Sequence, residues 1–162
     1  MLAKITQNEK EVLAHFERQL NHTKESVWSM LTDNDQLEKW FQELSVGELR
    51  NGGFMKFYME DVMDEELEIT EVKQFTVLEF DWFGDEIRFE LHEDPNGCVL
   101  ILKETINKVT EQTKKDLAGW HVCLDVIQAL LDGKSIQREE EWEEWHMEYS
   151  KVIDELTPST NK

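Results

Sequence analysis

The chain has 162 residues, of which 40% are hydrophobic, so it is long enough for one domain with a substantial core. Lys and Arg number 17 against 36 Asp and Glu, and the formal net charge of −19 excludes nucleic acid and anionic membrane surfaces as expected partners. The N-terminal residues lack the apolar run of a signal peptide, and no segment approaches the roughly 20 apolar residues that span a bilayer. We therefore expect a cytoplasmic protein.

The first part of the chain predicts one strand followed by two short helices. Residues 11–20 alternate between apolar and polar side chains, which indicates a half-buried strand with Arg18 on its inward face. Thr23 is a candidate N-cap for a helix that runs through Leu31. Asp33 begins a second short helix that ends near Trp40.

Residues 54–105 predict antiparallel strands. Large apolar side chains alternate with charged ones along residues 77–82 and 87–92, which indicates a sheet with one dry face and one wet face. The turn sequence at residues 94–97 predicts that the strand before it and the strand at residues 98–105 form a hairpin.

Residues 116–131 predict a long, largely buried helix that a left-handed glycine, Gly133, brings to an end. Residues 107–114 are then a polar connection. His121 and Asp125 fall on the narrow polar stripe of this helix, so we expect His121 to face solvent.

Residues 139–156 predict a second amphipathic helix, with Trp142, Trp145 and Tyr149 on one side. This side either docks on the chain's own domain or forms a partner surface. Docking is the favoured interpretation, because an exposed stripe with two tryptophans would be a large apolar patch. The expected organisation is a domain at residues 1–135, an appended helix at 136–157 and a frayed tail at 158–162.

Several local motifs together resemble the family named for the activator of the ninety-kilodalton heat-shock protein ATPase, within the START-like (SRPBCC) superfamily. They are Val27-Trp28, Gly52-Gly53-Phe54, Phe80-Asp81-Trp82 and Gly119-Trp120-His121. The resemblance covers about residues 12–133. It implies an α+β helix-grip fold, like that of birch-pollen allergens: a curved antiparallel sheet of about six or seven strands around the long helix, with a cavity between them.

The candidate ligand-binding residues are the inward-facing aromatic side chains and their neighbours on the long helix. A simple packing role is the alternative for each of them, and also for Met55, Met59 and Met63. Arg18 is the candidate polar anchor for a ligand carboxylate, although an ion pair with an acid such as Glu71 is the favoured interpretation. The predicted cavity wall consists of Trp40, Phe57, Trp82, Phe89, Trp120, Cys123 and Ile127.

No residue is nominated as catalytic. The five histidines form no metal-binding pattern, the two cysteines are expected to be reduced packing residues, and no nucleophile elbow, phosphate loop or dinucleotide motif occurs. We therefore expect no metal, cofactor or disulfide.

Three hypotheses about function follow. The first is non-enzymatic binding of a small hydrophobic or aromatic molecule that is lipid-, flavonoid- or polyketide-like, by a monomer or weak homodimer. The second, by family analogy, is a protein-interaction or co-chaperone-like module that uses the acidic surface and the last helix. The third is a polyketide-cyclase-like enzyme, which would require a carboxylate or histidine protruding into the cavity.

Overall fold

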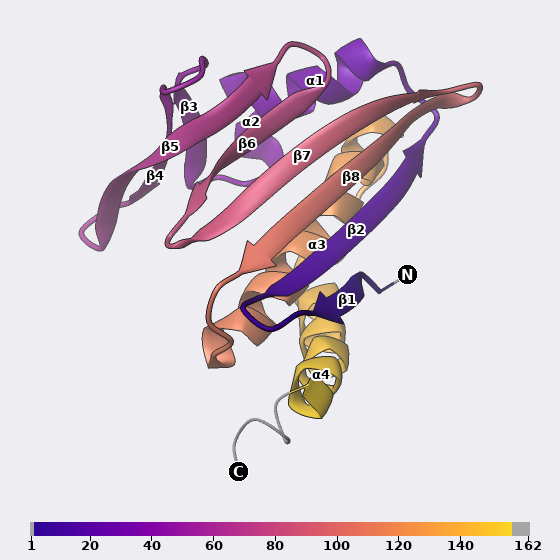
Figure 1. Cartoon of the computed structure of the whole chain (residues 1–162). Helices are drawn as coiled ribbons and strands as arrows, with labels where there is room; N and C mark the ends of the chain where they lie inside the picture. Colours follow the sequence, from indigo (N-terminus) through magenta and orange to yellow (C-terminus); the bar gives the residue numbers. More distant parts are fainter. Residues whose placement is uncertain (1, 157–162) are drawn as a thin grey trace. The chain divides into compact units, whose positions relative to one another are not determined.

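The computed structural model describes residues 2–156, which form eight strands and four helices (Figure 1). The strands form one sheet in the order β1-β2-β8-β7-β6-β5-β4-β3. This arrangement confirms the predicted α+β helix-grip fold class, with more strands than the expected six or seven. The elements are β1 (Lys4–Gln7), β2 (Val12–Leu20), α1 (Lys24–Thr32), α2 (Asn34–Trp40), β3 (Leu44–Glu48), β4 (Phe54–Met59), β5 (Met63–Lys73), β6 (Val77–Trp82), β7 (Asp85–Asp94), β8 (Gly97–Ile106), α3 (Glu111–Leu131) and α4 (Arg138–Leu156).

The described residues fall into two compact units. Unit 1 comprises the residues up to Phe16 and those from Thr105 onward, and it includes β1, α3 and α4. Unit 2 comprises Glu17–Glu104 and includes α1, α2 and the strands β3 to β7. Strands β2 and β8 have residues in both units.

In unit 2, the alternation of side chains along β6 and β7 produces the predicted dry and wet faces. The two strands pair antiparallel from Trp82 opposite Asp85 to Val77 opposite Glu90. Phe80 and Phe89 are buried on one face, whereas the charged residues between the apolar ones point the other way. The turn at residues 94–97 joins β7 to β8, as predicted.

The two short helices of unit 2 begin at the predicted caps. The Thr23 hydroxyl accepts a hydrogen bond from the Ser26 N–H at 3.1 Å, and the Asp33 carboxylate accepts one from the Asp35 N–H at 3.0 Å. The buried indole of Trp40, the last residue of α2, donates to the Met30 carbonyl at 2.7 Å. This bond holds the end of α2, and with it Trp40, against α1.

In unit 1, α3 begins earlier than predicted, at Glu111. The Thr110 hydroxyl accepts from the Gln112 N–H at 3.1 Å, and the Thr113 hydroxyl accepts from the Thr110 N–H at 2.9 Å. This capping box draws part of the expected polar connection into the helix. The helix ends as predicted, with Gly133 at φ +71°.

Helix α4 packs along α3, with Tyr149 and Ile153 buried, so the favoured docking interpretation is confirmed. The predicted frayed tail, residues 158–162, lies outside the described residues. Within residues 2–156, none of the helices combines the length and the apolar character that crossing a bilayer requires.

Candidate functional site

A continuous cluster of aromatic rings in unit 2 forms the candidate site. Phe41, Phe57 and Trp82 contact one another edge to face, with ring centroids 5.7 to 6.0 Å apart. Phe83 adds to them, at 5.3 Å from Phe57 and 5.0 Å from Trp82. Edge-to-face pairs at these distances contribute about 0.5–1.5 kcal/mol each beyond their buried area. We call these four residues the aromatic cluster.

The aromatic cluster extends into the core of unit 2 through Trp40, Phe80 and Phe89. Trp40 lies 6.0 Å from Phe41 and 6.3 Å from Phe89, and Phe80 lies 6.4 Å from Trp82. Four of the predicted wall residues, Trp40, Phe57, Trp82 and Phe89, are therefore brought together in one network of rings. Trp40, Phe80, Phe89 and also Trp82 are buried. The accessible rings of the network are therefore the half-buried Phe41 and Phe57 and the exposed Phe83.

The backbone at Phe83 is unusual for an aromatic residue. Phe83 and Gly84 join β6 to β7 and have φ values of +52° and +95°, the signs that a type I′ turn requires at both central positions. Asn or Asp is the ordinary residue at the first of these positions, and a left-handed conformation costs a bulky L residue roughly 1–2 kcal/mol. The turn nevertheless holds the Phe83 ring, 47% exposed, against Phe57 and Trp82.

Phe41 and Phe83 are members of the site that the sequence analysis missed. Phe41 directly follows Trp40 beyond the end of α2, where the helical pattern no longer shows which way a side chain points. The dipeptide Phe83-Gly84 did carry a signal, because an aromatic residue before the glycine of a two-residue turn departs from normal turn chemistry.

The other predicted wall residues, Trp120, Cys123 and Ile127, lie on α3 in unit 1 and are buried. The Cys123 sulfur lies 3.9 Å from Nη2 of Arg138. Ligand contacts of these three residues stay a prediction.

Arg18 is half-buried on β2, and its Nη1 donates to the Glu17 carbonyl at 2.9 Å. Glu71, the acid named as an example for the favoured ion pair of Arg18, pairs with Arg88 and Lys73 instead. An ion pair of Arg18 with another acid stays a prediction. Whether Arg18 anchors a ligand stays a prediction.

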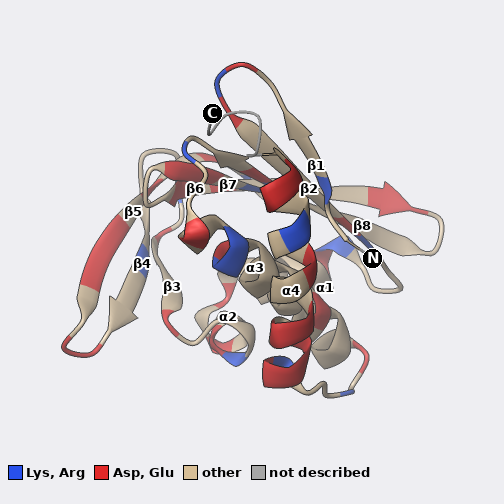
Figure 2. Ribbon diagram, turned by 90° about the horizontal axis from the view of Figure 1, so that it is seen from below, with Lys and Arg blue, Asp and Glu red and all other residues tan. Residues whose placement is uncertain are grey.

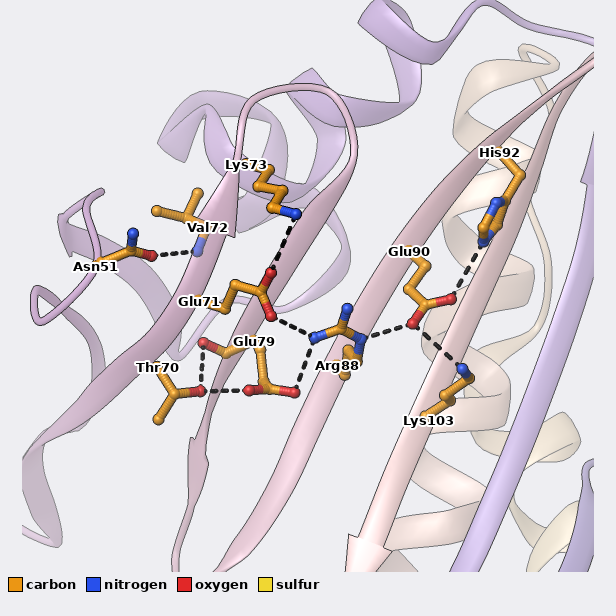
Figure 3. Close-up of polar contacts among 10 residues, drawn as sticks. All are labelled: Asn51, Thr70, Glu71, Val72, Lys73, Glu79, Arg88, Glu90, His92 and Lys103. Atoms are coloured by element: carbon orange, nitrogen blue, oxygen red, sulfur yellow. Dashed lines mark hydrogen bonds and ion pairs between the residues drawn. The ribbon is translucent and has the colours of Figure 1, made fainter.

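The polar face of the sheet carries an ion-pair network around Arg88 (Figure 3). Glu71, Glu79 and Arg88 lie opposite one another on β5, β6 and β7. Two glutamates in adjacent register repel each other, and Arg88 compensates both, because its Nη1 donates to Glu71 at 2.8 Å and to Glu79 at 3.1 Å. Its Nε donates to Glu90 at 2.6 Å.

The network shifts the acid–base equilibria of its members. Burial alone would raise the pKa of Glu90, but hydrogen bonds from Arg88, His92 and Lys103 outweigh it and lower that pKa to about 2. The hydrogen bond from Arg88 also lowers the pKa of Glu71, and the carboxylates in turn raise the pKa of Arg88. Arg88 is thus committed to three carboxylates, which gives it a role in holding β5, β6 and β7 together.

His121 does not face solvent, contrary to the prediction from the helical wheel. It is fully buried because α4 covers the polar stripe of α3, and Trp145 stacks on its ring at 3.9 Å. The Tyr149 hydroxyl lies 2.7 Å from His121 Nδ1 and accepts from the Ala3 N–H at 2.8 Å. In the tautomer with the imidazole proton on Nε2, the phenolic hydrogen is donated to Nδ1, and Nε2 lies 3.4 Å from the Asp125 carboxylate. These contacts join α3 and α4 to Ala3, the residue directly before β1.

The side chains of the aromatic cluster present ring faces and edges, which bind other molecules by non-covalent contact. Phenyl and indole groups bind apolar molecules by dispersion and by favourable ring geometry. None of these four side chains can transfer a proton or attack a carbonyl at neutral pH. The arrangement therefore favours binding over catalysis at this site.

A comparison with family models matches residues 21–132 to the family described as activator of Hsp90 ATPase homolog 1-like protein. The chain belongs to this family. The matched residues run from just before α1 to the end of α3, and they include the whole aromatic cluster. No curated protein matches the chain.

Solved structures with the same fold include three proteins from different organisms. A conserved protein of unknown function from Enterococcus faecalis is 24% identical, with a TM-score of 0.87 over 95% of this chain and 91% of its own. CalU16 from Micromonospora echinospora is 18% identical, with a TM-score of 0.70 over 94% of each chain. The Aha1 dimer from Colwellia psychrerythraea is 20% identical, with a TM-score of 0.62 over 72% of this chain and 92% of its own. At these identities the likeness shows the fold alone.

Proposed function

We propose that this member of the family binds a small hydrophobic or aromatic molecule at the aromatic cluster and does not chemically change it. The observation that carries the proposal is the half-exposed Phe83 ring, held by a left-handed backbone beside Phe57 and Trp82. Unfavourable backbone conformations persist where the surroundings hold them, and they gather at sites of function. A turn selected for stability alone would carry Asn or Asp at position 83.

The expected ligand is neutral, flat and largely apolar, as lipid-like, flavonoid-like and polyketide-like molecules are. Flat molecules match the edge-to-face arrangement of the rings, because they can present a face to one ring and an edge to the next. The formal net charge of −19 disfavours anionic ligands, and Asp81, Asp85 and Glu86 flank the turn that carries Phe83.

The test uses the neutral fluorescent dye N-phenyl-1-naphthylamine and the variant Phe83→Asn. Asparagine suits the left-handed turn position, so the relief of backbone strain offsets the lost ring contacts and we expect stability to change by less than about 1 kcal/mol. Dye affinity is expected to fall by roughly fivefold or more, which corresponds to about 1 kcal/mol. Fluorescence titration measures the affinity, and urea unfolding measures the stability.

Leu49→Asn is the matched control, since Leu49 is 41% exposed in unit 2 and contributes no ring. We expect it to bind the dye as the parent chain does. If the parent chain fails to bind both this dye and neutral flavonoids, or if Phe83→Asn binds them equally well, the proposal is wrong.

Family membership favours one second candidate, a co-chaperone-like interaction with an Hsp90-type ATPase. The apolar side of α4 is used in packing on α3, so the face available to a partner is acidic and includes Glu139, Glu140 and Glu143. The test is ATP hydrolysis by a purified Hsp90 with and without this chain. Stimulation that is lost when these three residues are replaced by Lys would support the interaction, and its absence with the parent chain would contradict it.

A further inference from the structure

We infer that the tip of the β4–β5 hairpin is a docking surface for a positively charged peptide segment that carries large apolar side chains. The surface, here called the hairpin patch, consists of Met59, Met63 and the turn residue Val62, whereas Tyr58 points to the opposite face of β4. The exposed fractions of Tyr58, Met59 and Val62 are 54%, 39% and 69%. Met59 lies on the same face of β4 as Phe57 of the aromatic cluster, two residues further along, but the inference does not depend on the proposed small-molecule site.

The concentration of exposed apolar side chains at this tip sets it apart from the rest of the chain. Seven large apolar side chains are exposed in the described residues, and three of them fall within the five residues from Tyr58 to Val62. Single exposed apolar residues are ordinary, whereas a contiguous group marks an interaction surface. Met63 lies directly opposite Met59 in the register and continues the group.

The hairpin tip is built so that a partner can reach it. The ladder between β5 and β6 runs from Ile69 to Lys73, and β3 pairs with β4 only as far as Phe57. The tip of the β4–β5 hairpin, where Met59 lies opposite Met63, therefore extends beyond both neighbouring strands as a two-stranded ribbon. Figure 1 shows this hairpin between β3 and β6. A two-stranded ribbon has little core of its own in which to bury large side chains. The apolar side chains of the hairpin patch are therefore placed where another molecule can cover them.

Charge identifies the class of partner. Six acidic residues and no basic residue lie between Phe57 and Thr70. Figure 2 shows the acidic residues along β5. Apolar side chains inside an acidic rim complement a segment with apolar anchors and Lys or Arg around them. A second copy of this chain would bring two acidic rims together, which disfavours self-association. Methionine adapts its shape to varied apolar anchors, as peptide-binding surfaces require.

The test measures binding of an 18-residue peptide of Lys and Leu, with Leu at helical spacing, by fluorescence anisotropy. The double variant Met59→Ser/Val62→Ser is compared with Leu49→Ser/Met147→Ser, which removes exposed apolar side chains elsewhere. We expect the hairpin variant to bind at least tenfold more weakly and the control to bind within twofold of the parent chain. Circular dichroism verifies that both variants are folded.

A second pair of variants tests the acidic rim with the same change in net charge in both variants. Glu65→Gln/Glu66→Gln removes two rim charges, and Glu139→Gln/Glu140→Gln removes two exposed charges from α4. The rim variant is expected to bind the peptide about fivefold more weakly than the α4 variant does. Equal losses would show that the peptide responds only to overall charge and would overturn the inference. A parent dimer that Met59→Ser/Val62→Ser abolishes would assign the patch to a second copy and would overturn it too. We expect the hairpin variants to bind the dye as the parent chain does, so either result leaves the proposed small-molecule site standing.

Discussion

Replacing Tyr149 with Phe tests whether the buried contact between Tyr149 and His121 stabilises unit 1. The variant removes one oxygen from a fully buried side chain and leaves the ring in place. The hydroxyl lies 2.7 Å from His121 Nδ1 and 2.8 Å from the Ala3 nitrogen, so two hydrogen bonds are lost with it. The Phe16 ring, 6.2 Å from that of Tyr149, remains packed against the new side chain.

The expected loss follows from which groups are left without a partner. His121 Nδ1 lies in the interior under Trp145, where water does not replace the lost bond, and a buried polar group without a partner costs roughly 1–3 kcal/mol. The Ala3 N–H is only partly buried and recovers some hydration. We therefore expect Tyr149→Phe to lower the free energy of unfolding by about 2–3 kcal/mol. For a chain of this length, that corresponds to a fall in Tm of roughly 5–10 °C.

Urea unfolding and differential scanning calorimetry measure the change, with Tyr58→Phe as the matched control. Tyr58 is 54% exposed, so the loss of its hydroxyl is expected to change stability by less than about 0.5 kcal/mol. The ¹⁵N chemical shifts of the His121 ring provide an independent measurement, with the proton expected on Nε2. Equal stability of Tyr149→Phe and Tyr58→Phe would refute the reasoning, and a proton on Nδ1 would refute the direction of the hydrogen bond.

Two further substitutions test the account of unit 2. Gly97→Ala is expected to lower the free energy of unfolding, measured with urea, by at least about 2 kcal/mol, because Gly97 has φ +143° and a Cβ there would collide with the Leu20 carbonyl oxygen. Gly84→Ala is the control: its Cβ would meet open space, so the expected loss is only about 1 kcal/mol. Glu90 has a folded pKa of about 2 against an ordinary 4.5, so its stabilising contribution is complete above pH 4.5 and is lost as pH falls toward 2. Glu90→Gln should therefore cost on the order of 2 kcal/mol at pH 7 and should flatten the acid part of the stability profile, unlike Glu68→Gln.

The regular parts of the fold were predictable because their side chains repeat with the period of the element. Residues 78–82 alternate strictly, and the strand predicted at residues 77–82 has the bounds of β6. The short strands β1 and β3 lack such a pattern, since each contains few buried residues, and they are defined by pairing with a neighbour. The aromatic residues predicted for the site in unit 2 do lie close together, because side chains that face inward on adjacent strands are neighbours.

Contacts between distant segments could not be predicted in the same way. The helical wheel assigned His121 to solvent because it considers one helix alone, and the residue that contacts it, Tyr149, lies 28 positions further along the chain. Arg18 has the predicted inward phase, but its proposed partner Glu71 is matched by register with Glu79 and Arg88. The face of the sheet to which a side chain points can be inferred from one strand alone, whereas its ion-pair partners depend on the register of several strands.

Both proposed binding surfaces occur where unit 2 departs from ordinary turn or surface chemistry, as the left-handed Phe75 at φ +64° also does. A consistent sequence would place Asn before Gly84 and polar side chains at the tip of the β4–β5 hairpin. Instead, Phe83 adopts a left-handed conformation with its ring half exposed, and Val62 is 69% exposed at the hairpin turn. The contacts of Phe83 with Phe57 and Trp82 still leave 47% of its side chain exposed. Such local conflicts persist in natural proteins chiefly where they serve binding, and this is the physical reason for looking at these two places first.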